Sequence, residues 1–127
     1  MKFHHIGYLT NSLRISTSNF NKLSYKKIGK PIIDNSLKVK IQFLKNRSNI
    51  IELIKPNLNN YGLINILKKK NYAYHLAYKV DDLEKTIFEL KKKFKIIVNP
   101  TPAKAFYNKK IAFFTMSDGF IIELIQS

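Results

Sequence analysis

The sequence of 127 residues predicts an α+β fold made of two copies of one unit, each ordered strand, helix, three strands. Two residue pairs reveal the duplication. His5 and His75 lie 70 residues apart, and each stands in an apolar segment near the start of its half. Glu52 and Glu123 lie 71 residues apart, and each stands in an apolar run at the end of its half. The difference of one residue fits a loop that is longer in one half.

The first half opens with a predicted strand over 3–10, where apolar and polar residues alternate. A helix is predicted over 13–24, and Asn11 or Ser12 could cap its start. The following stretch, "KIGKP", is interrupted by glycine and proline.

Two strands and a linking helix complete the first half. The segment "KVKIQFL" predicts a strand with Val39, Ile41 and Phe43 on one face and Lys38, Lys40 and Gln42 on the other. The segment "SNIIELIKP" predicts a second strand, which ends at Pro56. A helix over about 60–70 then joins the two halves.

The second half repeats this order. "YAYHLAYKV" predicts a strand, and "DDLEKTIFELKKK" predicts a helix that Asp81 or Asp82 caps. Its apolar stripe is Leu83, Ile87 and Leu90, and lysines gather at the end where the helix dipole favours them. "FKIIVNP" predicts a strand followed by a loop with two prolines. "KIAFFTM" and "FIIELIQ" predict strands joined by the turn "SDG". We therefore expect one domain over 1–127, with a first module over about 1–57, a linker helix over about 58–70 and a second module over about 71–127.

Composition narrows the possible functions. Without cysteine, the chain has no disulfide, thiolate metal site or cysteine nucleophile. No apolar run is long enough to cross a bilayer, and the N-terminus lacks the pattern of a signal peptide, so we expect a cytoplasmic protein without a membrane partner. The net charge is +15, but the basic stretches are short and dispersed, which disfavours a nucleic-acid partner and suits a small anionic ligand. The lysines also fit a compositional bias toward Lys, Asn and Ile.

The repeated histidines and glutamates predict a metal site. A carboxylate among apolar residues is costly unless it is protonated, paired or bound to a metal. If the two modules face each other, His5, Glu52, His75 and Glu123 supply two imidazoles and two carboxylates, which suit a divalent ion such as Zn, Mn, Co or Ni. A small residue follows two positions after each histidine and leaves room beside the imidazole. His4 is the alternative to His5 as a ligand. Taken singly, each histidine could be an ordinary core residue, and each glutamate could simply pair with a lysine.

Four segments in this order, "HHIGYLT", "IIELIKP", "YHLAYKVDDLEKTI" and "GFIIELIQS", resemble the vicinal oxygen chelate superfamily, to which glyoxalases and bleomycin resistance proteins belong. The central region is most similar to methylmalonyl-CoA epimerases. The resemblance covers nearly the whole chain. It implies paired βαβββ modules that form a curved sheet with a central cleft, and a homodimer.

By position, the resemblance implies that His5, Glu52, His75 and Glu123 bind the divalent metal. In such epimerases the metal holds the oxygens of an acyl thioester, carried by CoA or a carrier protein, and stabilises the enolate formed when a proton leaves. Two bases move the proton, and one of them matches Glu123. The other is a glutamate in the loop before the third strand. That loop here reads "PIIDNSLKV", where Asp34 is the only acid and is one methylene shorter.

Other functions of the same fold stay open. One is a glyoxalase I-type lyase that acts on a glutathione hemithioacetal. Another is ring-cleaving dioxygenation, which usually uses two histidines and one carboxylate on iron, so the fourth ligand argues against it. A third is a non-catalytic small-molecule-binding or resistance protein, against which the four intact ligands argue. Four aromatic residues could line a pocket or belong to the core: Phe106, Tyr107, Phe113 and Phe114.

Overall fold

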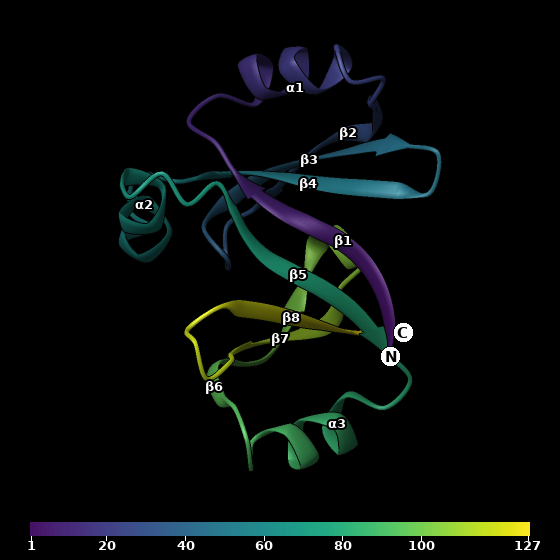
Figure 1. The fold of residues 1–127 in the computed structure, drawn as a ribbon, viewed down its shortest axis with the longest axis vertical. Helices are drawn as coiled ribbons and strands as arrows, with labels where there is room; N and C mark the ends of the chain where they lie inside the picture. Colours follow the sequence, from purple (N-terminus) through teal and green to yellow (C-terminus); the bar gives the residue numbers. More distant parts are fainter. The chain divides into compact units, whose positions relative to one another are not determined.

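A computed structural model describes residues 1–127 and contains eight strands, three α-helices and one short 3-10 helix (Figure 1). The first half comprises β1 Lys2–Leu9, α1 Leu13–Asn21, β2 Lys26–Asp34, β3 Val39–Asn46 and β4 Asn49–Pro56, followed by α2 Tyr61–Lys68. The second half comprises β5 Ala73–Val80, α3 Leu83–Leu90, β6 Lys95–Ala103, the 3-10 helix Lys104–Phe106, β7 Lys109–Thr115 and β8 Ile121–Gln126. The predicted order of strand, helix and three strands is confirmed in both halves.

The strands are hydrogen-bonded in the order β2-β3-β4-β1-β5-β8-β7-β6. β1 pairs with β4, and β5 with β8, in parallel, while the hairpin strands pair antiparallel. By compactness the chain divides into two units, which we call unit 1, residues Met1–His4 and His75–Ser127, and unit 2, residues His5–Tyr74. The first residues of β1 therefore belong to the same unit as the second half of the chain.

In unit 2, α1 covers one face of the strands (Figure 1). Ser12 caps this helix, since its side chain accepts a hydrogen bond from the backbone N–H of Ile15 at 3.1 Å. The helix ends at Asn21, three residues before the predicted end, and Ser24 has a φ of 70°. The core beneath it consists of Leu44, Ile51 and Leu53, with Tyr8, Leu13, Phe20 and Tyr25 packed against them.

In unit 1, Asp82 caps α3 by accepting a hydrogen bond from the backbone N–H of Lys85 at 3.0 Å. The predicted apolar stripe of this helix is confirmed: Leu83 is buried, and Ile87 and Leu90 pack on the same core. The buried members of that core are Val80, Leu83, Ala112, Phe114, Ile122 and Leu124.

The strands at the two ends of the hydrogen-bonding order are longer than the sequence predicts. The prediction that Pro100 and Pro102 lie in a loop is wrong, because β6 extends to Ala103. β6 and β2 have a neighbour on only one side, so a residue without an N–H is tolerated there. The pairing of both strands is irregular, and β2 has a bulge between Ile28 and Ile32.

Gln42 lies on the face opposite Ile41 and Phe43, as predicted, but it differs in burial from Lys40 on that face. It is buried, because its amide nitrogen donates hydrogen bonds across the bulge of β2 to the carbonyl oxygens of Ile28 and Gly29, each at 3.3 Å. The side chain thus fills the space that the bulge opens and ties β2 to β3.

The hairpins account for the two different repeat spacings. Between the paired residues Asn46 and Asn49, the β3–β4 turn contains only Arg47 and Ser48. The β7–β8 connection is longer and spans residues 116–120. Because the extra residue lies in this turn, the strands before it repeat at a spacing of 70 and the last strand at 71.

None of the helices is long and apolar enough to cross a bilayer.

The core of unit 1 yields a test of the packing. Phe114→Ala should lower the free energy of unfolding by about 3–5 kcal/mol, because the ring is fully buried and its removal leaves a cavity. Phe88→Ala is the matched control, since this ring on α3 is 57% exposed. Denaturant unfolding of both variants measures the difference, and a loss below about 1 kcal/mol for Phe114→Ala would contradict the assigned core.

Candidate metal centre

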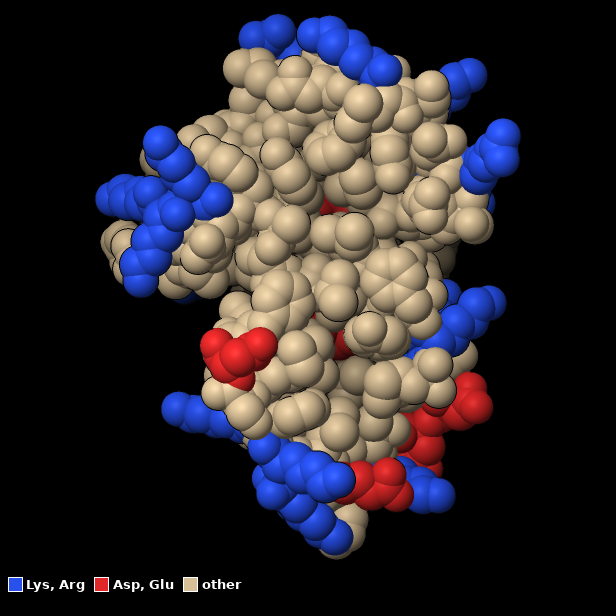
Figure 2. Space-filling model, viewed as in Figure 1, with Lys and Arg blue, Asp and Glu red and all other residues tan.

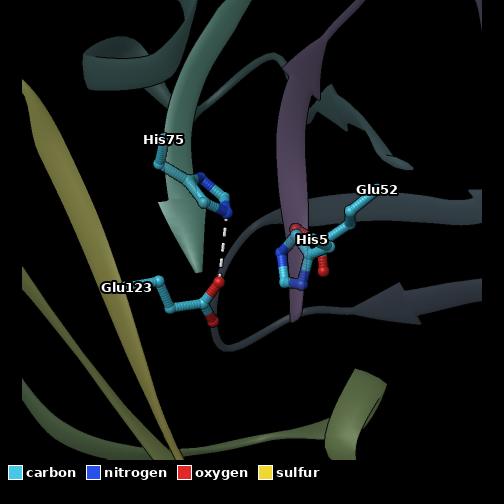
Figure 3. Close-up of side chains that lie close together, drawn as sticks. All are labelled: His5, Glu52, His75 and Glu123. Atoms are coloured by element: carbon cyan, nitrogen blue, oxygen red, sulfur yellow. Dashed lines mark ion pairs between the residues drawn. The ribbon is translucent and has the colours of Figure 1, made fainter. Parts of the chain in front are cut away.

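Unit 2 contains a buried histidine–glutamate pair. Parallel pairing of β1 with β4 places Glu52 opposite Gly7, and His5 lies two residues earlier on the same face of β1. The His5 Nε2 atom is 3.5 Å from the Glu52 Oε1 atom, and both side chains are almost fully buried (Figure 3). The residue opposite the carboxylate has no side chain, so the imidazole and the carboxylate can share that space.

Unit 1 contains the equivalent pair. Parallel pairing of β5 with β8 places Glu123 opposite Ala77, and His75 lies two residues before Ala77. The His75 Nε2 atom is 3.1 Å from the Glu123 Oε2 atom, and both side chains are again buried (Figure 3). The repeat seen in the sequence therefore reproduces the same contact in each unit.

Two phenylalanines belong to the same repeat. Their contacts with the histidines were missed in the sequence, where Phe113 was named as a pocket or core residue and Phe43 only as a strand residue. Phe43 lies directly opposite Glu52 on β3, and its ring meets the His5 ring edge to face at 6.0 Å. Phe113 lies directly opposite Glu123 on β7, and its ring meets the ring of His75 at 5.4 Å in the same manner. Such contacts restrict how an imidazole can turn. The signal was present, because "KIQFL" and "KIAFF" also repeat at a spacing of 70.

His4, the alternative to His5, has different surroundings. It points to the opposite face of β1, is only partly buried, and contacts Phe106 edge to face at 5.7 Å. Among the other aromatic candidates, Phe114 is a core residue and the Tyr107 side chain is 94% exposed.

Asp34 is the last residue of β2, where the sequence predicted a loop. Its buried carboxylate accepts a hydrogen bond from the backbone N–H of Leu37 at 3.1 Å, which stabilises the turn into β3. Asp34 pairs with Val39, so it shares a face with Glu52 but is displaced by four residues along β3, or about 13 Å. The corresponding position in unit 1 is Ala103, which pairs with the first residue of β7, so this acid is not part of the repeat.

The geometry of each pair suits a divalent cation. Donors bound at about 2.0–2.2 Å to one ion, and adjacent in tetrahedral or octahedral geometry, lie about 3–3.5 Å apart. The two nitrogen–oxygen distances, 3.5 and 3.1 Å, match this separation. His5, Glu52, His75 and Glu123 are all buried and offer nitrogen and oxygen ligand atoms that could hold a metal ion. The donor set therefore fits a divalent ion such as zinc, cobalt, manganese or nickel.

Comparison with known proteins agrees with this fold. Residues 4–113 match the Glyoxalase/Bleomycin resistance protein/Dioxygenase superfamily. A sequence comparison with curated proteins finds no significant match.

Solved structures resemble the chain over nearly its full length. A hypothetical protein from Bacillus halodurans C-125 is 25% identical, with a TM-score of 0.86 over 99% of this chain and 94% of that chain. Methylmalonyl-CoA epimerase from Mycobacterium tuberculosis is 19% identical, with a TM-score of 0.83 over 98% and 87%. A Streptomyces coelicolor methylmalonyl-CoA epimerase in complex with 2-nitronate-propionyl-CoA is 16% identical, with a TM-score of 0.85 over 100% and 97%. These structures share the fold, and the match over residues 4–113 covers most of the sequence. The chain therefore belongs to the glyoxalase/bleomycin resistance protein/dioxygenase superfamily.

Proposed function

We propose that this protein is a divalent-metal-dependent isomerase, similar to methylmalonyl-CoA epimerase, which removes and returns a proton at the carbon next to a thioester carbonyl. We also propose that His5, Glu52, His75 and Glu123 together bind one ion. The observation that carries the proposal is the repeated buried contact between imidazole and carboxylate, at a separation suited to neighbouring ligands of one cation.

A bound divalent ion would supply Lewis acidity toward the oxygens of an acyl thioester. The chain itself supplies orientation and proton transfer. Phe43 and Phe113 hold the two imidazoles by edge-to-face contacts, and both carboxylates are buried. Enclosure excludes water, which strengthens electrostatic interactions with the substrate.

In this proposal Glu123 is the base that accepts the proton from the substrate carbon. A carboxylate beside an imidazole in apolar surroundings is suited to general-base catalysis. Epimerisation also needs a group on the opposite side of that carbon, and Asp34 is the candidate for this second base. Of the eight acidic residues in the chain, only Asp34, Glu52 and Glu123 are buried.

The structural relatives support the substrate class. Methylmalonyl-CoA epimerase has been solved in complex with methylmalonyl-CoA, and the resemblance to that structure covers 99% of this chain with a TM-score of 0.83. We therefore propose an acyl thioester, carried by CoA or a carrier protein, as the substrate. A homodimer and a cytoplasmic location stay predictions.

A second candidate is a glyoxalase I-type lyase acting on a glutathione hemithioacetal, and the surroundings of Asp34 favour it. The carboxylate of Asp34 already accepts a hydrogen bond from the turn. Asp34 lies opposite Val39, which is four residues along β3 from Phe43, the residue opposite Glu52. Proton transfer between adjacent carbons on one side of a substrate needs a single base, for which Glu123 suffices.

Metal binding tests the ligand set. We expect one divalent ion per chain, and His5→Ala or His75→Ala should weaken its binding by more than the roughly 10- to 100-fold typical for loss of an outer-shell partner. His4→Ala is the control, because it removes a neighbouring imidazole that contacts Phe106. Calorimetric titration with Zn²⁺ and Co²⁺ measures the affinities. Equal metal affinities for His4→Ala and His5→Ala, or no bound metal in the wild type, would contradict the proposed metal centre.

Proton exchange tests the two bases. Glu123→Gln should reduce incorporation of deuterium from D₂O at the 2-position of a methylmalonyl thioester by about 10²- to 10⁴-fold, the usual contribution of a general base. Each variant is compared with the wild type at equal metal content, read by mass spectrometry. If Asp34 is the second base, Asp34→Asn should still exchange the proton of one enantiomer while losing interconversion of the two.

The two candidate functions predict different results in the same experiment. No exchange with any malonyl-type thioester, together with turnover of a glutathione hemithioacetal, would reject the isomerase and favour the lyase.

A further inference from the structure

The net positive charge is concentrated in unit 2. Lys and Arg are shared in proportion to length, with 13 in unit 2, all exposed, and 10 in unit 1, but unit 1 also contains six acidic residues whereas unit 2 contains two. Its only acidic residues, Asp34 and Glu52, are buried. Around α1 and α2 the charged groups visible at the surface are Lys and Arg, whereas acidic groups appear over α3 (Figure 2). The surface lysines of unit 2 therefore have no exposed carboxylate in their own unit to neutralise them.

Two of these lysines share a face with the candidate metal ligands. Lys26 on β2 lies directly opposite Lys45 on β3, and Lys45 lies opposite Ile50 on β4. Strand alternation places these residues on the face that carries His5, Phe43 and Glu52, which we call the site face of unit 2. The lysine pair is two residues along β3 from Phe43.

This pair is unfavourable by itself. Like charges directly opposite each other on paired strands repel, and unit 2 offers no exposed acid to offset the repulsion. Lys40 and Lys55 form a second such pair on the opposite face, so the face shared with the candidate metal ligands is what distinguishes the Lys26–Lys45 pair. A bound anion would convert this repulsion into two attractive contacts. A phosphate is well suited, since it offers several oxygens to two ammonium groups.

The distance from His5 limits which anion can bind. With neighbouring strands about 4.8 Å apart, the Cα atoms of Lys45 and Lys26 lie about 10 and 14 Å from that of His5. An anion bound by these lysines would lie well away from the candidate metal ligands. A substrate that occupies both places therefore needs a long arm between its anionic group and its reacting carbon. We propose that Lys26 and Lys45 form an anion-binding subsite for the phosphate on the carrier arm of a phosphopantetheine-type thioester. This proposal rests on the proposed thioester substrate and adds a residue-level site for the part of that substrate that does not react.

The lysine pair of unit 2 is not repeated in unit 1. In unit 1 the corresponding strand positions are Lys95 and Thr115, which also lie opposite each other. One lysine and one hydroxyl do not create the same repulsion, so we expect the phosphate to bind to unit 2.

The experiment uses a matched pair of double variants of the full chain. Lys26→Gln/Lys45→Gln removes two charges from the site face, and Lys40→Gln/Lys55→Gln removes two from the opposite face of the same sheet, where these lysines also lie directly opposite each other. Calorimetry with free coenzyme A at low and high salt measures binding without turnover. We expect the first variant to bind at least about tenfold more weakly at low salt, with the difference reduced at high salt, and the second to bind like the wild type.

Further comparisons identify the ligand group and separate this proposal from the proposed function. A pantetheine thioester without phosphate should have the same KM with both double variants. KM values for the same acyl group on CoA and on a holo carrier protein show which carrier the subsite binds. A larger increase in KM for Lys26→Gln/Lys45→Gln than for Lys40→Gln/Lys55→Gln with either carrier supports the subsite. Equal losses in both double variants, or an equal loss with the phosphate-free thioester, overturn the subsite. If coenzyme A binding is selectively weakened although the wild type exchanges no proton with any thioester, the subsite stands and the isomerase proposal fails.

Discussion

A carboxylate enclosed by apolar strands is the constraint on which the rest of this structure depends. Such a group is stable only with a partner, and each unit provides a histidine whose Nε2 atom lies within 3.5 Å of it. The partner comes from a strand that runs parallel to the strand of the glutamate. Parallel neighbours require a long crossover, and in each unit a helix and two strands supply it. The βαβββ order thus brings each histidine to its glutamate.

Much of this arrangement could be predicted because it repeats. A single glutamate in "IIELI" has many plain explanations, but two at matched positions, with a histidine 47 residues earlier in one half and 48 residues earlier in the other, are hard to explain separately. Strand alternation then predicted the strands and showed that a small residue shares a face with each histidine. Helical spacing predicted that Leu83, Ile87 and Leu90 pack on one core. These features depend on local periodicity, which a sequence displays directly.

The rest depends on pairing between strands, which local periodicity does not display. The contacts of Phe43 and Phe113 with the histidines emerge only when β3 and β7 are set beside the strands of the glutamates, although Phe113 was one of four aromatic residues predicted for a pocket or the core. The family resemblance placed Asp34 in a loop, whereas β2 continues through Gly29 and Pro31 to Asp34, since a strand with one neighbour tolerates both. Alternation placed Gln42 on the same face as Lys40, but it could not show that the carbonyl groups at a bulge of β2 hold this side chain inside. In each case the partner lies on another strand, and register decides the environment.

The assignment of Met1–His4 to unit 1 has a consequence for how the duplication can be taken apart. A gene fragment that starts after α2 would encode β5–β8 and α3 but not the short N-terminal stretch that completes their unit. The complementary fragment would keep the whole of β1, but the first four residues of the chain would lose the compact unit to which they belong. A cut between the two sequence repeats therefore does not coincide with the boundary between the two compact units.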